Sequence, residues 1–287
     1  MTVPKLVKFA KTHALGNDFL IVDRRELPTP DAWPALARSM CHRRRGVGAD
    51  GLVVFEVAGG DLFSMTLLNQ DGSYAEISGN GLRCLGAHLR ISGLARDAAI
   101  VVETGSGTRT LEFIEATGPR VVFKAAMGAP RLASAEIPFQ IDPPQEPVKG
   151  VPLEVAGRTL EITAVSMGNP HCVVFVDRLD RDVVLELGPL IESHSRFPRK
   201  TNAEFVSVRS RSEIAMRIWE RGAGETEASG TGSAAAAVAS MLNGKTDDRV
   251  TVECPGGKLE VHWENRQEVY VTGEAVVVAE GTFEIEN

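Results

Sequence analysis

Two serines at matched positions each begin a glycine-rich turn, and each turn runs into a helix-like apolar pattern. Residues 78–81 read Ser-Gly-Asn-Gly, and residues 229–232 read Ser-Gly-Thr-Gly. A helix start presents unpaired N–H groups and the positive end of the helix dipole, so it can bind a carboxylate. Two such starts around one small anion suit racemisation, in which one group removes a proton from carbon and another returns it on the opposite face.

A simpler interpretation is that Ser78 and Ser229 are plain N-caps, a position that favours serine. Local sequence alone favours this simpler interpretation. The duplicated context around the two turns favours a shared pocket instead.

The repeat extends beyond the two serines, which lie 151 residues apart (229 − 78) in a chain of 287. Residues 16–23 recur as residues 168–177, with Asn17 matched to Asn169. Residues 66–72 are echoed by residues 216–222, with Asn69 matched to Glu220. Three pieces that recur in the same order at nearly one offset predict two like domains rather than a solenoid of short units.

Composition excludes several classes of function. Hydrophobic residues make up 43% of the chain, no apolar run is long enough to span a membrane, and the N-terminus lacks the apolar region of a signal peptide. We therefore expect a cytoplasmic protein with no membrane partner. The net charge of −7 is spread over interspersed acids and bases, so we expect no nucleic-acid partner. The basic run His42–Arg45 is expected to cap the helix around residues 31–41.

The four cysteines show no metal-ligand spacing, and we expect no metal. In a reducing compartment they are expected to be free thiols buried as small apolar groups. Cys84 and Cys172 lie close to the motifs, yet we expect them in the core rather than in catalysis.

Many short apolar runs alternate with polar residues, as half-buried antiparallel strands do. Helices are predicted over Gly81–Ile91 and over the alanine-rich Ser233–Leu242, which is expected to be central. The Pro-rich stretch Ile137–Pro152 is predicted to be an irregular crossing between domains, with an ordinary surface loop as the alternative. Strands are predicted over residues 52–56, 63–68, 99–102, 109–114, 120–124, 159–165, 172–176, 204–208, 214–219, 249–252, 258–262 and 268–271.

Seven motifs together resemble those of the diaminopimelate epimerases, over nearly the whole chain. They are His-Ala-Leu-Gly-Asn-Asp-Phe (13–19), Gly-Val-Gly-Ala-Asp-Gly (46–51), Asn-Gln-Asp-Gly-Ser (69–73), Gly-Asn-Gly-Leu-Arg-Cys (79–84), Gly-Asn-Pro-His (168–171), Thr-Asn (201–202) and Glu-Arg-Gly-Ala-Gly-Glu-Thr (220–226).

The resemblance implies an α+β fold of two similar, pseudo-symmetric domains. Each would be a central helix wrapped by mostly antiparallel strands, with the site in the interdomain cleft. We expect one domain over residues 1–129 plus 277–287 and the other over residues 130–276. The implied activity is epimerisation of LL-diaminopimelate to the meso form by two-base proton transfer, for lysine and peptidoglycan synthesis. It needs no pyridoxal phosphate or other cofactor, and the family usually works as a homodimer.

The chain departs from the family at the two central positions, where the family has cysteines and this chain has Ser78 and Ser229. A hydroxyl is a far weaker base than a thiolate unless a neighbour activates it. Three explanations fit: a cysteine-to-serine variant, a natural branch with altered proton chemistry, or a catalytically silent amino-acid-binding protein. A racemase or dehydratase acting on another amino acid is a further alternative.

The other motif residues match, so the resemblance assigns roles to them. Taken singly, each also has a structural interpretation: turn residues beside glycine for Asn17 and Asn169, a core histidine for His171, an ion pair for Glu220. Arg83 and Cys84 are left outside the site. The predicted site consists of Ser78 and Ser229 as the acid/base pair, His171 and Glu220 assisting them, Asn17, Asn69, Asn169, Asn202 and Arg221 on the polar ends of the substrate, and Gly79, Asn80, Gly230 and Thr231 around its carboxylate.

Overall fold

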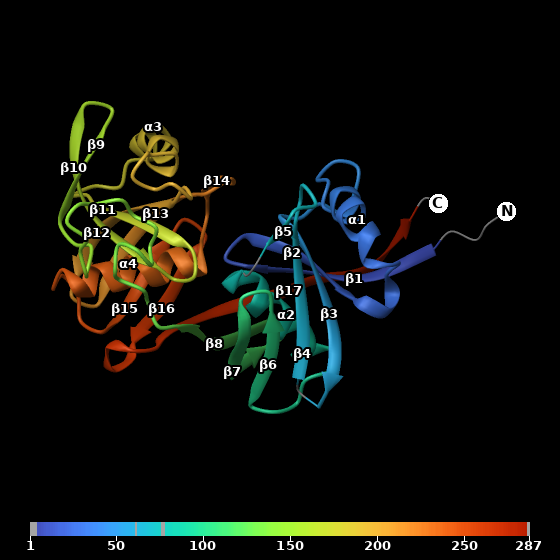
Figure 1. Ribbon diagram of the computed structural model, residues 1–287. Coiled ribbons are helices and arrows are strands. Elements are labelled where there is room, and N and C mark those ends of the chain that lie inside the picture. Colours follow the sequence, from blue (N-terminus) through green and yellow to red (C-terminus); the bar gives the residue numbers. More distant parts are fainter. Residues whose placement is uncertain (1–4, 61, 76–77, 286–287) are drawn as a thin grey trace. The chain divides into compact units, whose positions relative to one another are not determined.

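The computed structural model describes residues 5–60, 62–75 and 78–285 (Figure 1). The chain divides into two compact units, residues 1–125 with 273–287 and residues 126–272. The α-helices are α1 (Trp33–Met40), α2 (Gly79–Ile91), α3 (Arg181–Glu192) and α4 (Gly230–Leu242), and the short 3₁₀ helices cover Arg24–Glu26, Pro30–Ala32 and Glu264–Arg266.

Strands make up most of the remaining chain. They are β1 (Lys5–Ala14), β2 (Asn17–Asp23), β3 (Gly51–Gly59), β4 (Leu62–Asn69), β5 (Tyr74–Ala75), β6 (Ala99–Thr104), β7 (Gly107–Thr117), β8 (Arg120–Gly128), β9 (Val151–Val155), β10 (Arg158–Ser166), β11 (Pro170–Phe175), β12 (Asn202–Ser210), β13 (Glu213–Glu220), β14 (Gly224–Thr226), β15 (Arg249–Cys254), β16 (Gly257–Trp263) and β17 (Val269–Ile285).

The two units repeat one order of elements and one pattern of strand pairing. In the first, β1 and β2 are antiparallel, β2 and β3 parallel, β3 and β4 antiparallel, β4 and β6 parallel, and β6 and β7 antiparallel. The second unit shows the same alternation of antiparallel and parallel pairs, in the order β10, β11, β12, β13, β15 and β16. The predicted fold of two similar α+β units with mostly antiparallel strands is confirmed.

Each unit buries one helix at its centre. Ten of the 13 residues of α2 are buried, and α4 buries every residue except Leu242. The side chains of Ala234–Ala237 are small, which lets the surrounding strands approach α4 closely. The strong burial explains why these helices form despite two glycines in each first turn, because tertiary packing outweighs helix propensity.

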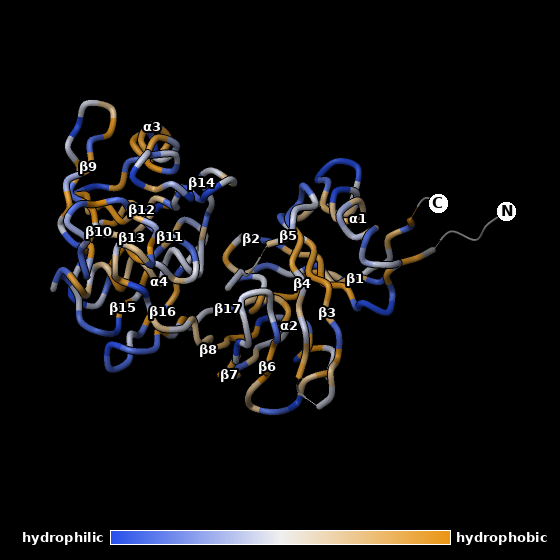
Figure 2. Tube along the Cα trace, viewed as in Figure 1, coloured by the Kyte–Doolittle hydropathy of each residue, from blue (hydrophilic) through white to orange (hydrophobic). Residues whose placement is uncertain are grey.

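The innermost strands are buried on both faces because a second helix covers the face turned away from the central one. In the first unit Leu20 and Val22 of β2 join a cluster with Trp33 and Met40 of α1. In the second, Val174 of β11 joins a cluster with α3. Side chains alternate along a strand, so residues 171, 202 and 204 are on the face opposite the α3 cluster. Figure 2 shows hydrophobic colour along β3 and β4 and hydrophilic colour in many connecting loops.

The predicted strands are all present, but the sequence missed β1, β2, β5, β9, β14 and helix α3. The two central helices begin at Gly79 and Gly230, before the predicted starts at residues 81 and 233, because their glycine-rich turns form the first helical turn.

One predicted crossing is wrong. Residues 137–152 lie wholly inside the second unit, and the chain passes from one unit to the other within β8 and within β17. The stretch is irregular up to β9, as expected, but it is no ordinary surface loop. Ile137 and Val148 are completely buried in the core of the second unit, which explains why a Pro-rich stretch carries these apolar side chains.

Candidate active site

The two helix starts have nearly the same geometry. Ser78 has φ −135° and ψ 121°, and its Oγ accepts the N–H of Gly81 at 3.0 Å. Ser229 has φ −137° and ψ 127°, and its Oγ accepts the N–H of Gly232 at 3.2 Å. Both serines are therefore N-caps, as the simpler interpretation predicts. Each cap satisfies one N–H group of its helix start, Gly81 in α2 and Gly232 in α4, and a helix start of this kind is suited to an anion.

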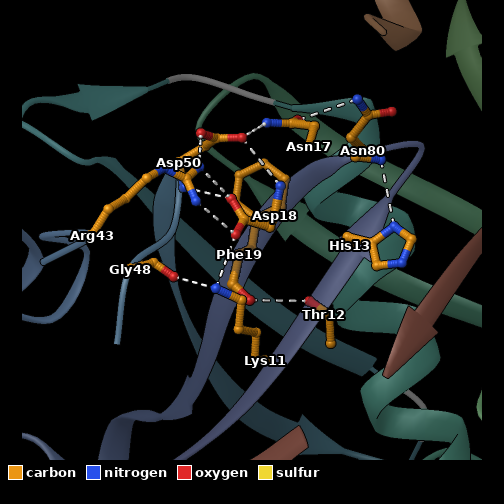
Figure 3. A network of polar contacts seen from close by, with 11 residues as sticks. Lys11, Thr12, His13, Asn17, Asp18, Phe19, Arg43, Gly48, Asp50 and Asn80 are labelled. Carbon is orange, nitrogen blue, oxygen red and sulfur yellow. Dashed lines mark hydrogen bonds and ion pairs between the residues drawn. The ribbon is translucent and has the colours of Figure 1, made fainter. Parts of the chain in front are cut away.

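In the first unit, a chain of hydrogen bonds joins the two predicted residues Asn17 and Asn80 (Figure 3). Asn80 Nδ2 donates to Oδ1 of Asn17 at 3.2 Å, and Asn17 Nδ2 donates to Oδ2 of Asp50 at 2.7 Å. At the other end, Arg83 Nη2 donates to Oδ1 of Asn80 at 2.5 Å. A guanidinium only donates and a carboxylate only accepts, so the two ends determine the orientation of both amides.

Arg83 therefore contacts the predicted site, although the sequence analysis placed it outside. Its side chain is completely buried, and among the described residues its Nε and Nη1 have no hydrogen-bond partner. Burial lowers the pKa of Arg83 to about 10. A buried guanidinium with two unpaired groups is costly, which indicates a role other than stability.

Charged residues surround the carboxylate end of this series of hydrogen bonds. Arg43 bridges the carboxylates of Asp18, at 2.8 Å, and Asp50, at 2.5 Å, and Lys11 lies 3.0 Å from Asp18 (Figure 3). Burial raises the pKa of Asp18, but the hydrogen bonds and charges of Arg43 and Lys11 outweigh burial and lower it. The expectation that the basic run caps the preceding helix is thus wrong for Arg43, because two nearby carboxylates bind it more strongly than a helix end does.

Asn69 lies apart from these bonds. It ends β4, its side chain is exposed, and its Nδ2 donates to Oγ of Ser73 at 2.9 Å within a turn. The next residue, Gln70, donates its N–H to the carbonyl of Asp50 at 3.0 Å. The turn that carries Asn69 is therefore tied by its backbone to the residue that orients Asn17.

In the second unit, His171 joins several predicted residues. Its Nε2 lies 2.9 Å from Oδ1 of Asn169, and its Nδ1 lies 2.6 Å from Oε1 of Glu204. Asn202 Nδ2 lies 3.4 Å from the same Nδ1, and Asn202 Oδ1 accepts the N–H of Arg221 at 2.8 Å. Asn169, His171, Asn202 and Arg221 thus form one connected group.

Sequence reasoning missed Glu204, which is completely buried. Burial raises the pKa of its carboxyl, and the charge of Glu220 raises it further, while the charge and hydrogen bond of His171 lower it in part. A signal existed in the sequence, because Glu204 stands two places after Asn202 on β12 and so must share its face. A Cβ added at Gly232 would lie 3.2 Å from Glu204 Oε1, which places Glu204 against the first turn of α4.

Glu220 ends β13, and Arg221 begins the turn to β14. Glu220 Oε1 accepts the hydroxyl of Thr226, a neighbour at the end of β14, at 2.5 Å. Arg221 Nη1 donates to the carbonyl of Arg199 at 3.1 Å, and the side chain is exposed. Gly222 N–H donates to Glu192 of α3 at 3.2 Å, which holds the turn in place.

The cysteines lie in the core, as predicted. All four are buried and free. Burial raises the pKa of Cys84 to about 12 and that of Cys172 well above its ordinary value, so these thiols stay protonated at neutral pH. Within the described ranges, no group of three or more His, Cys, Asp or Glu side chains could hold a metal ion. None of the described helices is long and apolar enough to cross a membrane.

Solved structures with this fold define its class. The chain superposes on a phenazine biosynthesis protein of the PhzF family from Bacillus anthracis with a TM-score of 0.72 at 18% identity, over 98% of this chain and 100% of the other. It superposes on a probable proline racemase from Agrobacterium radiobacter with a TM-score of 0.70 at 14% identity, over 98% and 93%. The fold is thus the pseudo-symmetric one shared by PhzF-like proteins and proline racemases.

Sequence similarity identifies the family within that class. The family model described as diaminopimelate epimerase matches residues 9–133 and 163–278. A diaminopimelate epimerase from Pelotomaculum thermopropionicum is 47% identical, over 96% of this chain and 98% of its own length. Another, from Desulfitobacterium hafniense, is 44% identical, over 96% and 97%. This chain belongs to the diaminopimelate epimerase family, which confirms the resemblance drawn from the motifs.

Proposed function

We propose that this protein epimerises diaminopimelate at one α-carbon, between the LL and meso forms, without pyridoxal phosphate. The observation that carries the proposal is the pair of serine-capped helix starts with matching backbone geometry, in a chain of this family. The product would serve lysine and peptidoglycan synthesis.

The proposed site is shared between the two units. Each unit, taken by itself, holds part of the predicted set: Asn17, Asn69, Ser78, Gly79 and Asn80 in the first, and Asn169, His171, Asn202, Glu220, Arg221, Ser229, Gly230 and Thr231 in the second. We propose that the substrate lies in a cleft between the units, with its α-carbon between the two serine hydroxyls.

In the proposed reaction, one serine acts as its alkoxide and takes the α-proton to become a hydroxyl. The hydroxyl of the other serine gives its proton to the opposite face of the carbon and becomes the alkoxide. Negative charge would then develop on the substrate carboxylate. The N–H groups of the first turns of α2 and α4 would stabilise that charge, because they need no reorganisation as the charge forms. His171 and Glu220 would tune the protonation of the pair, and the asparagines with Arg221 would bind the polar ends of the substrate.

The serines favour a slow reaction or none. A thiol has a pKa of about 8.5, and a helix start lowers it further, whereas a hydroxyl ionises far less readily. Each Oγ also accepts a hydrogen bond as an N-cap, which reduces its basicity. This second observation supports the alternative of a silent amino-acid-binding protein, and a change of substrate to another amino acid is a further alternative.

Incubation with LL-diaminopimelate in deuterium oxide separates these possibilities. We expect slow incorporation of deuterium at the α-carbon together with formation of the meso isomer, measured by mass spectrometry and chiral chromatography. Tight binding of diaminopimelate in calorimetry, with no deuterium incorporated, would replace the epimerase proposal with the silent binding protein. Deuterium exchange into another amino acid, but not into diaminopimelate, would show that the substrate is that other amino acid.

The cleft has its own test. A ligand that bridges the two units should draw them together about the strands that connect them, and proton transfer from carbon requires that water be excluded. We expect small-angle scattering to show a smaller radius of gyration when diaminopimelate is bound. An unchanged profile at saturating ligand would contradict closure on the substrate.

We further propose that the protein is a cytoplasmic homodimer, as the family resemblance implies. Light scattering should then give twice the chain mass of 30.8 kDa. A mass of 30.8 kDa at micromolar concentration would contradict the dimer, and cell fractionation tests the location.

A further inference from the structure

The side chains of His171 and Glu204 form a closely spaced pair inside the second unit. Nδ1 of His171 lies 2.6 Å from Oε1 of Glu204, and both side chains are completely buried. An unprotonated imidazole nitrogen and a carboxylate oxygen are both acceptors, and two acceptors do not approach this closely without a proton between them. The distance therefore requires a proton between Nδ1 and Oε1.

The second ring nitrogen adds to the proton count. Nε2 of His171 lies 2.9 Å from Oδ1 of Asn169, which accepts and does not donate. Nε2 must then carry its own hydrogen. A neutral imidazole has one N–H, so a ring with hydrogen on Nε2 leaves Nδ1 as an acceptor, and the proton on the Nδ1 side is an additional one.

Asn202 does not replace that proton. Its Oδ1 accepts the N–H of Arg221, which leaves Nδ2 as its donor, and Nδ2 donates to the carbonyl of Pro170 at 3.2 Å. Its distance of 3.4 Å from Nδ1 of His171 is much longer than the 2.6 Å contact with Glu204. Glu204 is therefore the principal partner of Nδ1.

The surroundings oppose an unshared charge on Glu204. Oε2 of Glu204 is buried, and among the described residues it has no hydrogen-bond partner. The charged group that acts on it from β13 is Glu220, which is also acidic. From α4, the positive end of the helix dipole at Gly232 favours a carboxylate and offsets part of the effect of burial and of Glu220. A lone buried carboxylate here would be costly, whereas a pair that shares a proton is neutral as a whole.

We infer that Glu204 and His171 together hold one proton more than a carboxylate and a neutral imidazole would, so that Glu204 keeps a hydrogen on Nε2 of His171 beside the first turn of α4. Glu204 is then a positioning residue that acts through His171. It determines which ring nitrogen carries hydrogen and keeps the pair electrically neutral next to the turn that Ser229 caps. The proton count stands by itself, and only its use in catalysis rests on the proposed function.

The test is proton and nitrogen NMR of the full-length, ligand-free protein with ¹⁵N-labelled histidine at neutral pH. The chain has six histidines, so single variants of the other five assign His171 by elimination. We expect a hydrogen bonded to Nε2 of His171 and a second, strongly deshielded proton on the Nδ1 side. An Nε2 without hydrogen, as would follow if Asn169 donated its amide, overturns the inference in the unaltered protein.

Variants then identify the partner. Glu204→Gln keeps the size of the side chain and can donate an amide hydrogen to Nδ1, so we expect the deshielded proton to disappear while Nε2 keeps its hydrogen. Glu220→Gln is the matched control and should leave both signals in place. Survival of the deshielded proton in Glu204→Gln would overturn the role of Glu204. These measurements use no substrate, so their failure and a failure of the deuterium exchange test are distinguishable.

Discussion

The starts of α2 and α4 have nearly the same backbone geometry, but different side chains pack against them. At the start of α2, a Cβ added at Gly81 would lie 3.5 Å from the ring of Phe19. At the start of α4, the equivalent Gly232 faces Glu204, which is bonded to His171. His171 occupies the position in the second repeat that Phe19 occupies in the first (171 − 152 = 19).

The two units therefore differ in the strand residues that pack against the caps and not in the caps themselves. The cap is made by backbone and one hydroxyl, so it survives changes in the strands below. The strand residues that face the cap set its electrostatic surroundings, and they have become apolar in one unit and ionisable in the other. Two like helix starts can therefore hold protons of unequal affinity, which a reaction with one proton donor and one acceptor requires.

The largest expected effect comes from placing a cysteine thiol at both helix starts. Replacement of both serines, Ser78→Cys with Ser229→Cys, should raise epimerase activity by roughly 10²- to 10⁴-fold, because a thiol ionises far more readily than a hydroxyl. Chiral chromatography of the products measures the change. Each single replacement should recover much less, since both faces of the carbon need a competent group.

Ser92→Cys, at the opposite end of α2, is the matched control and should leave activity unchanged. Activity that stays flat in the double variant, while calorimetry still shows substrate bound, would contradict the acid/base roles of the two serines.

The second effect compares alanine substitutions at Gly81 and Gly232, which differ in the space available for a new Cβ. Both occupy the third position of their helices, so the gain in helix propensity from alanine is the same and cancels. At Gly232 the new Cβ would lie 2.5 Å from the buried Cδ1 of Ile218, whereas at Gly81 the nearest atom is Cβ of Ser78 at 3.3 Å. Gly232→Ala should be less stable than Gly81→Ala by about 1–3 kcal/mol. Urea unfolding of the two variants measures this, and equal stabilities would contradict the closer packing at α4.

The third effect tests the buried Arg83, whose equivalent in α4 is Ala234. Arg83→Met keeps the volume and removes the charge, so the melting temperature should stay unchanged or rise. Asn80 would lose the donor that orients it, and diaminopimelate should bind about tenfold more weakly in calorimetry. Arg90→Met, at the second-last residue of α2, is the control for a generic loss of arginine. Unchanged affinity in Arg83→Met would show that Arg83 does not orient the asparagines.

The smallest effect is a difference in pH dependence. The folded-state pKa of Asp18 is lowered, so its contribution to stability is present above its unfolded pKa of about 3.9 and is lost as pH falls through the folded value. The folded-state pKa of Glu204 is raised, so its contribution is present below its unfolded pKa of about 4.3 and is lost as pH rises through the folded value.

Urea unfolding from about pH 3 to about pH 8 tests these opposite signs. In Asp18→Asn, the free energy of unfolding should fall less steeply as the pH is lowered. In Glu204→Gln, it should fall less steeply as the pH is raised. The same change of slope in both variants would contradict the contrast between the two units.

Several features followed from the sequence because they depend on neighbouring residues. The two serine caps, the buried central helices and the alternating strands are local patterns, and the ordered repeat made two like units a direct consequence. Asn17 and Asn169 were predicted in the same way, through matched turns. The exact domain boundaries near residues 129 and 276 and the residue roles remain predictions.

Other features depend on contacts between residues far apart in the chain. β1 pairs with the adjacent β2 and also with the end of β17, more than 260 residues away (for example Val7 opposite Phe283), and the second pairing leaves no signal in the local sequence. Arg83 looked like an ordinary helical residue, and only burial without a carboxylate partner marked it as unusual. Glu204 acquired its role from His171 on a neighbouring strand, 33 residues earlier in the sequence.

The sequence by itself therefore determined the caps, the repeat and the residue types at the two helix starts. The tertiary structure decided which of those residues touch and whether the pKa of a carboxyl group is lowered, as for Asp18, or raised, as for Glu204. The physical reason is that caps and strand periodicity act within a few residues, whereas burial and charge depend on everything that packs around a group.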